Sequence, residues 1–154
     1  MSTGTFDKYY LSAKGVKYIC DAKRGMCTDI NPQICQTITA KGQTNWTGSF
    51  ISKTIDHLEK SKTIGSTEPT KIYLKDGRVL TSDDDLSMLD ARRMTPRECG
   101  RLMGFSDRDI DMVLAINSDS QAYHQFGNSI VENILVAIIG QMIEGKEDEY
   151  GKRA

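Results

Sequence analysis

The stretch RRMTPRECGRLMGF, residues 92–105, decides the second half of the chain. Thr95 and Glu98 have the spacing of a capping box, in which the threonine hydroxyl accepts from the Glu98 amide and the Glu98 side chain returns to the threonine amide. Pro96 then stands at the first helical position, where its missing N–H costs nothing. Gly104 is expected to end the helix. The stretch therefore predicts a short, capped helix.

Two further helices are predicted downstream. One opens at Ser106, and the other follows the turn at residues 126–129, with the polar segment 117–125 as a connection. The last helix carries apolar residues over half of its circumference or more, whereas an ordinary surface helix needs a stripe of only about 100°. We expect this helix to pack on two sides, to end at Gly145 and to precede a charged tail, residues 146–154.

The first 80 residues predict short strands and irregular loops around one helix. Ser12 is a suitable cap for a helix that runs to about Arg24. The Asp76-Gly77 pair separates two β-prone runs and predicts a two-residue hairpin turn with positive φ at both central residues. The segment 40–48 is a loop rich in hydrogen-bonding side chains.

Charge is divided unevenly along the chain. The net charge of the 154 residues is −1, but residues 1–78 hold 12 basic and 7 acidic residues (+5), and residues 79–154 hold 8 and 14 (−6). The basic half favours phosphate contact, although ordinary scatter of surface charge explains the same division. With no uninterrupted apolar run of about 18 residues and no signal segment, we expect a cytoplasmic protein without membrane contact.

The cysteine and histidine spacing predicts no metal site. The four cysteines, Cys20, Cys27, Cys35 and Cys99, form no C-x-x-C pair, and the two histidines lie far apart. Zinc sites need closely spaced ligands of these types. The cysteines are therefore expected to be reduced, structural thiols.

Three segments resemble one enzyme family. Residues 92–105 closely resemble the ninth conserved motif of C5-cytosine DNA methyltransferases, and residues 120–131, SQAYHQFGNSIV, resemble the tenth, in matching order and spacing. Residues 31–40, NPQICQTITA, resemble a segment that often reads Pro-Thr-Leu-Thr-Ala. This places Thr37 and Ile38 where family members carry a threonine and an aliphatic residue in their target recognition region. The resemblance is to the C-terminal part of the family.

The resemblance implies an α+β fold, the small lobe of such an enzyme. We expect an irregular, β-rich target recognition region at residues 1–85, a C-terminal motif region with the closing helix at 86–145, and the tail at 146–154. The family's Rossmann-like catalytic lobe has no counterpart: the Phe-x-Gly-x-Gly, Pro-Cys-Gln and Glu-Asn-Val motifs are missing. In the family, a cysteine thiolate adds to an extruded cytosine, which then takes a methyl group from S-adenosylmethionine. Ile34 rather than proline precedes Cys35, so no residue is assigned as catalytic.

Asn128, together with Ser129, is the expected cofactor contact. The corresponding asparagine of the family stands at the edge of the S-adenosylmethionine pocket, so the resemblance implies this role only with a partner lobe. Physically, a Gly127-Asn128-Ser129 turn ahead of a helix would offer free N–H groups to a carboxylate. The alternative is that Asn128 simply caps the last helix.

The expected DNA contacts lie in the first half. Thr37 and Ile38 are assigned through the resemblance, and Lys41, Gln43 and Asn45 through residue type. Glutamine and asparagine suit adenine, and lysine suits guanine or the phosphate backbone. A solvated polar loop is the alternative for each of the three loop residues.

Three interpretations follow for the whole chain. The first is the DNA-recognition and cofactor-pocket-completing part of a DNA (cytosine-5)-methyltransferase, with double-stranded DNA and a catalytic large subunit as partners, or self-association through the C-terminal helix. The others are an inactive phage or mobile-element remnant and a stand-alone DNA-binding regulator. The acidic second half and the wide apolar stripe favour the split enzyme over the regulator. Alone, the chain is predicted to be inactive.

Overall fold

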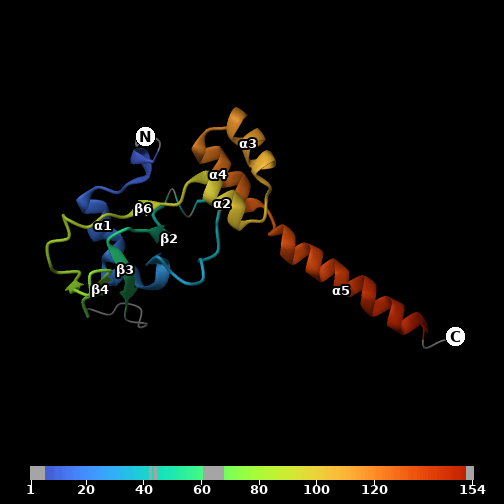
Figure 1. Ribbon diagram of the computed structural model, residues 1–154, viewed down its shortest axis with the longest axis horizontal. Helices are drawn as coiled ribbons and strands as arrows, with labels where there is room; N and C mark the ends of the chain where they lie inside the picture. Colours follow the sequence, from blue (N-terminus) through green and yellow to red (C-terminus); the bar gives the residue numbers. More distant parts are fainter. Residues whose placement is uncertain (1–5, 42, 44, 61–67, 152–154) are drawn as a thin grey trace. The chain divides into compact units, whose positions relative to one another are not determined.

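The chain forms two compact units, residues 1–95 and residues 96–154. The computed structural model describes residues 6–41, 43, 45–60 and 68–151 (Figure 1). The division falls later than the predicted boundary at residue 85. The reason is that strand β6, Arg92–Arg93, pairs with strand β2, Gly48–Ile51, inside the first unit.

Short helical elements open the described part of the first unit. They are the 3-10 helix η1 (Asp7–Tyr9), the α-helix α1 (Ala13–Cys20) and the 3-10 helix η2 (Ala22–Cys27). The Ser12 hydroxyl accepts from the Gly15 amide at 3.3 Å, which confirms the predicted cap. The helix ends before the expected Arg24, because Asp21 is extended (φ −61°, ψ 129°) and caps η2 instead.

Two three-stranded sheets follow among the described residues of the first unit. The first contains β1 (Thr28–Ile30), β2 and β6, and the second contains β3 (Ile55–Glu59), β4 (Lys71–Leu74) and β5 (Val79–Thr81). In the first sheet, β2 is central, parallel to β1 and antiparallel to β6. The second is an antiparallel meander with β4 in the middle. The long connection from β1 to β2 carries the expected DNA contacts.

The β4–β5 hairpin confirms the two predicted strands but not the turn. The Gly77 amide donates to the Leu74 carbonyl at 3.0 Å, and the Leu74 amide donates to the Arg78 carbonyl at 2.9 Å. Of the two central residues, only Gly77 has positive φ, at 88°. The loop is therefore three residues long and ends in a left-handed glycine. The Arg78 side chain and amide bond the Asp76 carboxylate and lower its pKa.

The core of the first unit packs α1 against the sheets. Val16, Ile19 and Cys20 are fully buried, and their spacing places them on one helical face. Opposite them, the sheets contribute a set of fully buried side chains: Ile30, Phe50, Ile55 and Ile72. The core therefore fixes the strands from which the β1–β2 connection leaves and to which it returns.

The described residues of the second unit form four helices rather than the predicted three. They are α2 (Pro96–Leu102), α3 (Asp107–Ile116), α4 (Asp119–Asn128) and α5 (Glu132–Gly151). The segment 117–125, expected as a connection, mostly belongs to α4. Ser118 and Gln121 form a capping box at its start, with the Gln121 amide donating to the Ser118 hydroxyl at 3.3 Å. Tyr123 and Phe126 bury its inner face.

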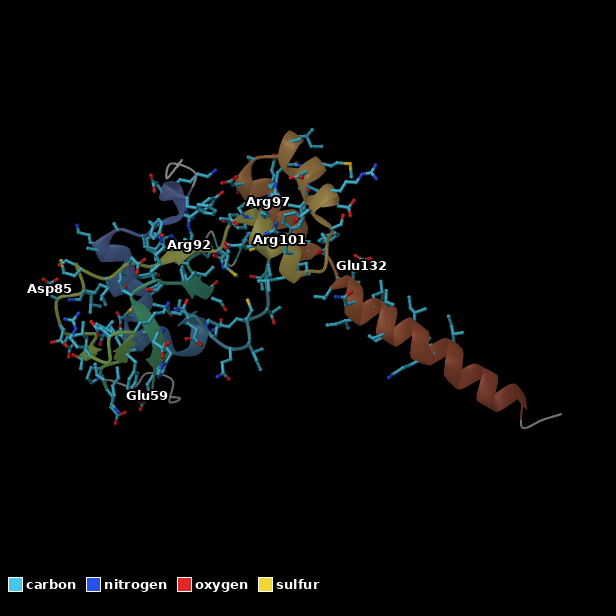
Figure 2. The ribbon with its side chains drawn as sticks, viewed as in Figure 1. Glu59, Asp85, Arg92, Arg97, Arg101 and Glu132 are labelled. Atoms are coloured by element: carbon cyan, nitrogen blue, oxygen red, sulfur yellow. The ribbon has the colours of Figure 1, made fainter. Side chains whose placement is uncertain are left out.

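Helices α2 and α3 pack closely at Gly100. A methyl group on this residue would lie 2.8 Å from the Cγ1 atom of Ile110 and 3.0 Å from the Cζ atom of Phe126. At the surface, Arg101 pairs with Asp107 through its Nε atom at 2.7 Å, and Arg97 also extends from α2 toward α3 (Figure 2). These contacts tie the helices of the second unit together.

Helix α5 buries very little of its apolar surface. It continues past Gly145, so the predicted end there is wrong. Eight apolar side chains between residues 130 and 143 are 41% to 66% exposed. By length and composition alone, the stretch Asp119–Ile143 is apolar enough to cross a membrane. The sequence analysis found no membrane span because polar residues such as Asn133 and Gln141 interrupt the apolar run, whereas the mean hydropathy of the stretch is still high.

Candidate functional site

The five expected DNA contacts all lie in the connection between β1 and β2. Thr37, Lys41 and Asn45 are exposed, and Ile38 is half-buried. Gln43 is only 5% exposed. The structure therefore brings the five residues into one segment but turns Gln43 inward.

Gln43 links β2 to Met94, the residue that follows β6, through its side-chain amide. Its Nε2 atom donates to the Ser49 carbonyl at 3.3 Å, and its Oε1 atom accepts from the Met94 amide at 3.2 Å. Both ends of the amide are thus occupied by backbone groups. To read a base edge, Gln43 would have to break both bonds, and a base-reading role for it remains a prediction.

A hollow lies beside the same segment. It is shallow and opens to solvent. Its walls include Thr37, Ile38 and Thr39 on one segment and Gln43 and Met94 on others. The threonine hydroxyls and the two apolar side chains give it a mixed lining. Thr37 and Ile38, the two residues assigned by the family resemblance, thus line the same hollow as Gln43.

Directly after β2, the turn at residues 52–54 carries the basic residue Lys53. One carboxylate oxygen of Asp90 accepts from the Ser52 hydroxyl at 3.0 Å, the Lys53 amide at 3.1 Å, the Thr54 amide at 2.9 Å and the Thr54 hydroxyl at 2.6 Å. Partial burial would raise the pKa of Asp90, but these hydrogen bonds lower it below its usual value. The exposed Lys53 therefore stands on a fixed turn.

Asn128 and Ser129 lie at the end of a helix rather than ahead of one. Asn128 is the last residue of α4, and α5 begins only at Glu132. The Ser129 amide and hydroxyl both donate to the Phe126 carbonyl, at 3.2 Å and 2.6 Å. The end of a helix presents carbonyl groups and partial negative charge, so the expected free N–H groups are absent from this described turn. Asn128 does not cap α5 either.

The fit to S-adenosylmethionine therefore depends on one side chain. Asn128 is exposed, and its amide can both donate and accept. The Ser129 amide N–H and hydroxyl O–H both donate to the backbone. Among these two residues, the exposed Asn128 amide is therefore the group whose chemistry suits a hydrogen bond to a cofactor. Within the described part of the chain, no three His, Cys, Asp or Glu side chains are grouped to hold a metal ion.

All four cysteines are free thiols. Cys20 and Cys99 are buried, Cys27 is exposed, and the Cys35 thiol donates to the Gln36 carbonyl at 3.3 Å. Burial raises the pKa of Cys20 to about 11, although the Lys60 ammonium opposes this shift. A reactive thiolate needs the opposite shift, so Cys20 is a core residue.

Two structurally important residues were missed from sequence. Trp46 lies in the polar loop yet packs against the core, and its apolar ring within a polar segment was a usable signal. Asp90 had no such signal, because its partners lie 36 to 38 residues away along the chain.

Comparison with known proteins identifies the relatives of this chain. The model of the C-5 cytosine-specific DNA methylase family matches residues 12–144. A DNA-cytosine methyltransferase of Escherichia coli K12 is 47% identical over 41% of this chain and 15% of its own length. The type II methyltransferase M2.ScrFI of Lactococcus lactis subsp. cremoris is 28% identical over 66% of this chain and 24% of its own length. The matched part thus spans 15% to 24% of these two relatives.

Proposed function

This chain belongs to the C-5 cytosine-specific DNA methylase family, and from that membership we propose that it is the small, C-terminal lobe of a DNA (cytosine-5)-methyltransferase. Its first unit contacts double-stranded DNA, and its second unit completes the cofactor pocket. The catalytic lobe, with the nucleophilic cysteine, lies outside these 154 residues. S-adenosylmethionine supplies the methyl group when bound, and Asn128 contacts it at the pocket edge.

The apolar surface of α5 is the observation that carries the proposal. At 100° per residue, the apolar positions from Ile134 to Ile143 span about 260° of the helix circumference. Ile134 and Ile138 are 55% and 52% exposed. A soluble protein rarely leaves such a patch open unless a partner covers it. A helix apolar on this many sides suits a groove rather than a flat surface, and the missing catalytic lobe is its proposed occupant.

Complementation tests the enzymatic part of the proposal. The chain is co-expressed with a catalytic lobe of the same family that carries the Phe-x-Gly-x-Gly and Pro-Cys-Gln motifs, and 5-methylcytosine is mapped in the DNA. The pair is expected to methylate cytosine at one sequence, and either part alone to methylate none. Methylation by the purified chain alone would refute the proposal, as would failure of a soluble complex to transfer any methyl group.

Variants of α5 test the docking surface. Changing Ile134 and Ile138 to asparagine removes the burial of two half-exposed side chains, about 1 kcal/mol each, and should weaken the complex by about 30-fold or more. Asn133→Ser lies outside the apolar arc and serves as the matched control. Analytical ultracentrifugation measures the association. The docking proposal would be wrong if the chain bound no catalytic lobe but bound lipid vesicles, and if the double variant lost that vesicle binding. A membrane would then be the partner of α5.

A further inference from the structure

The loop at residues 40–48 is here called the recognition loop, and its described residues, 40–41, 43 and 45–48, are anchored at two points. Gln43 provides the first anchor through its bonds to Ser49 and Met94. Its side chain is 5% exposed, and its amide joins β2 to the last residues of the first unit. A loop of polar residues normally samples several conformations. The two hydrogen bonds of the buried Gln43 side chain to backbone groups restrict the loop to fewer conformations.

Trp46 provides the second anchor. Its ring packs against the core and meets the Tyr18 ring edge-on, with 5.8 Å between centroids. It sits directly over Gly15 of α1: a methyl group there would lie 2.6 Å and 2.8 Å from the Cζ3 and Cη2 atoms of the indole. The backbone of Trp46 has φ of 58°, which a bulky residue rarely adopts. Such a conformation persists where the surrounding contacts hold it.

Between and beside these anchors, Lys41 and Asn45 point outward. The Asn45 amide donates to the Lys41 carbonyl at 2.8 Å, which closes a single helical turn. Residues four apart on such a turn lie on the same face, and both are exposed. Lysine and asparagine are the residue types that bind phosphate or guanine and adenine, respectively.

We propose that Gln43 and Trp46 are positioning residues that hold Lys41 and Asn45 as a fixed pair for reading DNA. The inference rests on the recognition role proposed above. In this proposal the buried Gln43 and Trp46 fix the conformation of the loop, and the exposed Lys41 and Asn45 contact the DNA. Gly15, on a different element, becomes a determinant of DNA selectivity because no other residue leaves room for the Trp46 ring.

A glycine substitution tests the Trp46 anchor. Gly15→Ala places a methyl group against the indole and should displace it, and Trp46 is the only tryptophan of the chain. We expect its fluorescence maximum to move to longer wavelength and its quenching by acrylamide to increase. Gly140→Ala is the matched control, since a methyl group there meets nothing within 4 Å. Unchanged Trp46 fluorescence in Gly15→Ala would overturn the inference.

DNA selection links the anchors to function. The complex with the catalytic lobe is incubated with a random duplex library, and the bound sequences are compared between variants. Gly15→Ala and Gln43→Leu should each lower the preference for the selected site over random duplex by about 10-fold, while affinity for random duplex changes less than about 3-fold. Phenylalanine lacks the two clashing indole carbons, so Trp46→Phe should restore selectivity to Gly15→Ala.

The outcomes separate this inference from the proposed function. If the wild-type complex enriches no sequence, the recognition role is wrong and the positioning role falls with it. If the wild type is selective and Gly15→Ala shifts the Trp46 fluorescence without loss of selectivity, only the positioning role is wrong. Loss of selectivity in Gly15→Ala with rescue by Trp46→Phe supports both.

Discussion

Replacing Asp90 with alanine should destabilise the first unit by about 2 kcal/mol. One oxygen of this carboxylate accepts four hydrogen bonds from Ser52, Lys53 and Thr54. A hydrogen bond to a charged group contributes about 1.5–3 kcal/mol when it is well shielded. Here the site is partly exposed and water replaces the lost acceptor, so we take about 0.5 kcal/mol for each bond.

Asparagine at the same position separates geometry from charge. The Oδ1 atom of the introduced asparagine can keep all four hydrogen bonds, so Asp90→Asn loses the charge and the longer contact of the second oxygen with the Lys53 amide (3.3 Å), and should cost about 1 kcal/mol at pH 7. The folded-state pKa of Asp90 is lowered, so its contribution is present above the ordinary value of about 4 and is lost as the pH falls through the folded pKa. The stability difference between wild type and Asp90→Asn should therefore shrink below pH 4.

Urea denaturation followed by Trp46 fluorescence measures this effect between pH 7 and pH 3. Trp46 packs against the core of the same unit and is the only tryptophan, so it reports on the relevant transition. Asp83 is an exposed aspartate that follows β5, and Asp83→Asn controls for the general effect of removing one negative charge. An Asp90→Ala variant within about 0.3 kcal/mol of the wild type would refute the reasoning, as would a difference between wild type and Asp90→Asn that does not change with pH.

Three further expectations concern the second unit and the cysteines. Gly100→Ala should lower the stability of the second unit by about 1 kcal/mol in thermal unfolding followed by circular dichroism, because its methyl group would stand 2.8 Å from a buried α3 carbon. Gly140→Ala should not destabilise the unit, and equal melting temperatures of the two variants would contradict this expectation. At pH 8, Ellman's reagent should modify the exposed Cys27 first and Cys20, with its pKa of about 11, only after unfolding; early loss of Cys20 would disprove its burial. Asn128→Ala should leave the melting temperature of the chain within about 2 °C, since the residue is exposed, and should weaken S-adenosylmethionine binding in the assembled enzyme; unchanged affinity in calorimetry would remove its proposed role.

Local chemistry in the sequence determined the starts of several helices and one hairpin. Ser12 and Ser106 accept hydrogen bonds from amides three residues ahead, and this geometry needs no tertiary partner. The spacing of Val16, Ile19 and Cys20 likewise defined the buried face of α1. The capping box of Ser118 and Gln121 is also present in the sequence, but the polar composition of the residues that follow it favoured a connection over a helix.

Contacts between distant segments were decided by the tertiary structure alone. Gln43 and Met94 are 51 residues apart, and nothing in the polar loop indicates that this one amide turns inward. Residues 126–128 belong to α4, whose inner face is buried through Tyr123 and Phe126, so a turn ahead of a helix at these positions was a wrong expectation. Helical periodicity and caps act over about four residues, whereas a hydrogen bond across the fold depends on which segments the core brings together. The sequence by itself therefore determined the family and most of the elements, and the packing of those elements decided which polar side chains of the recognition loop face outward and which hold the loop.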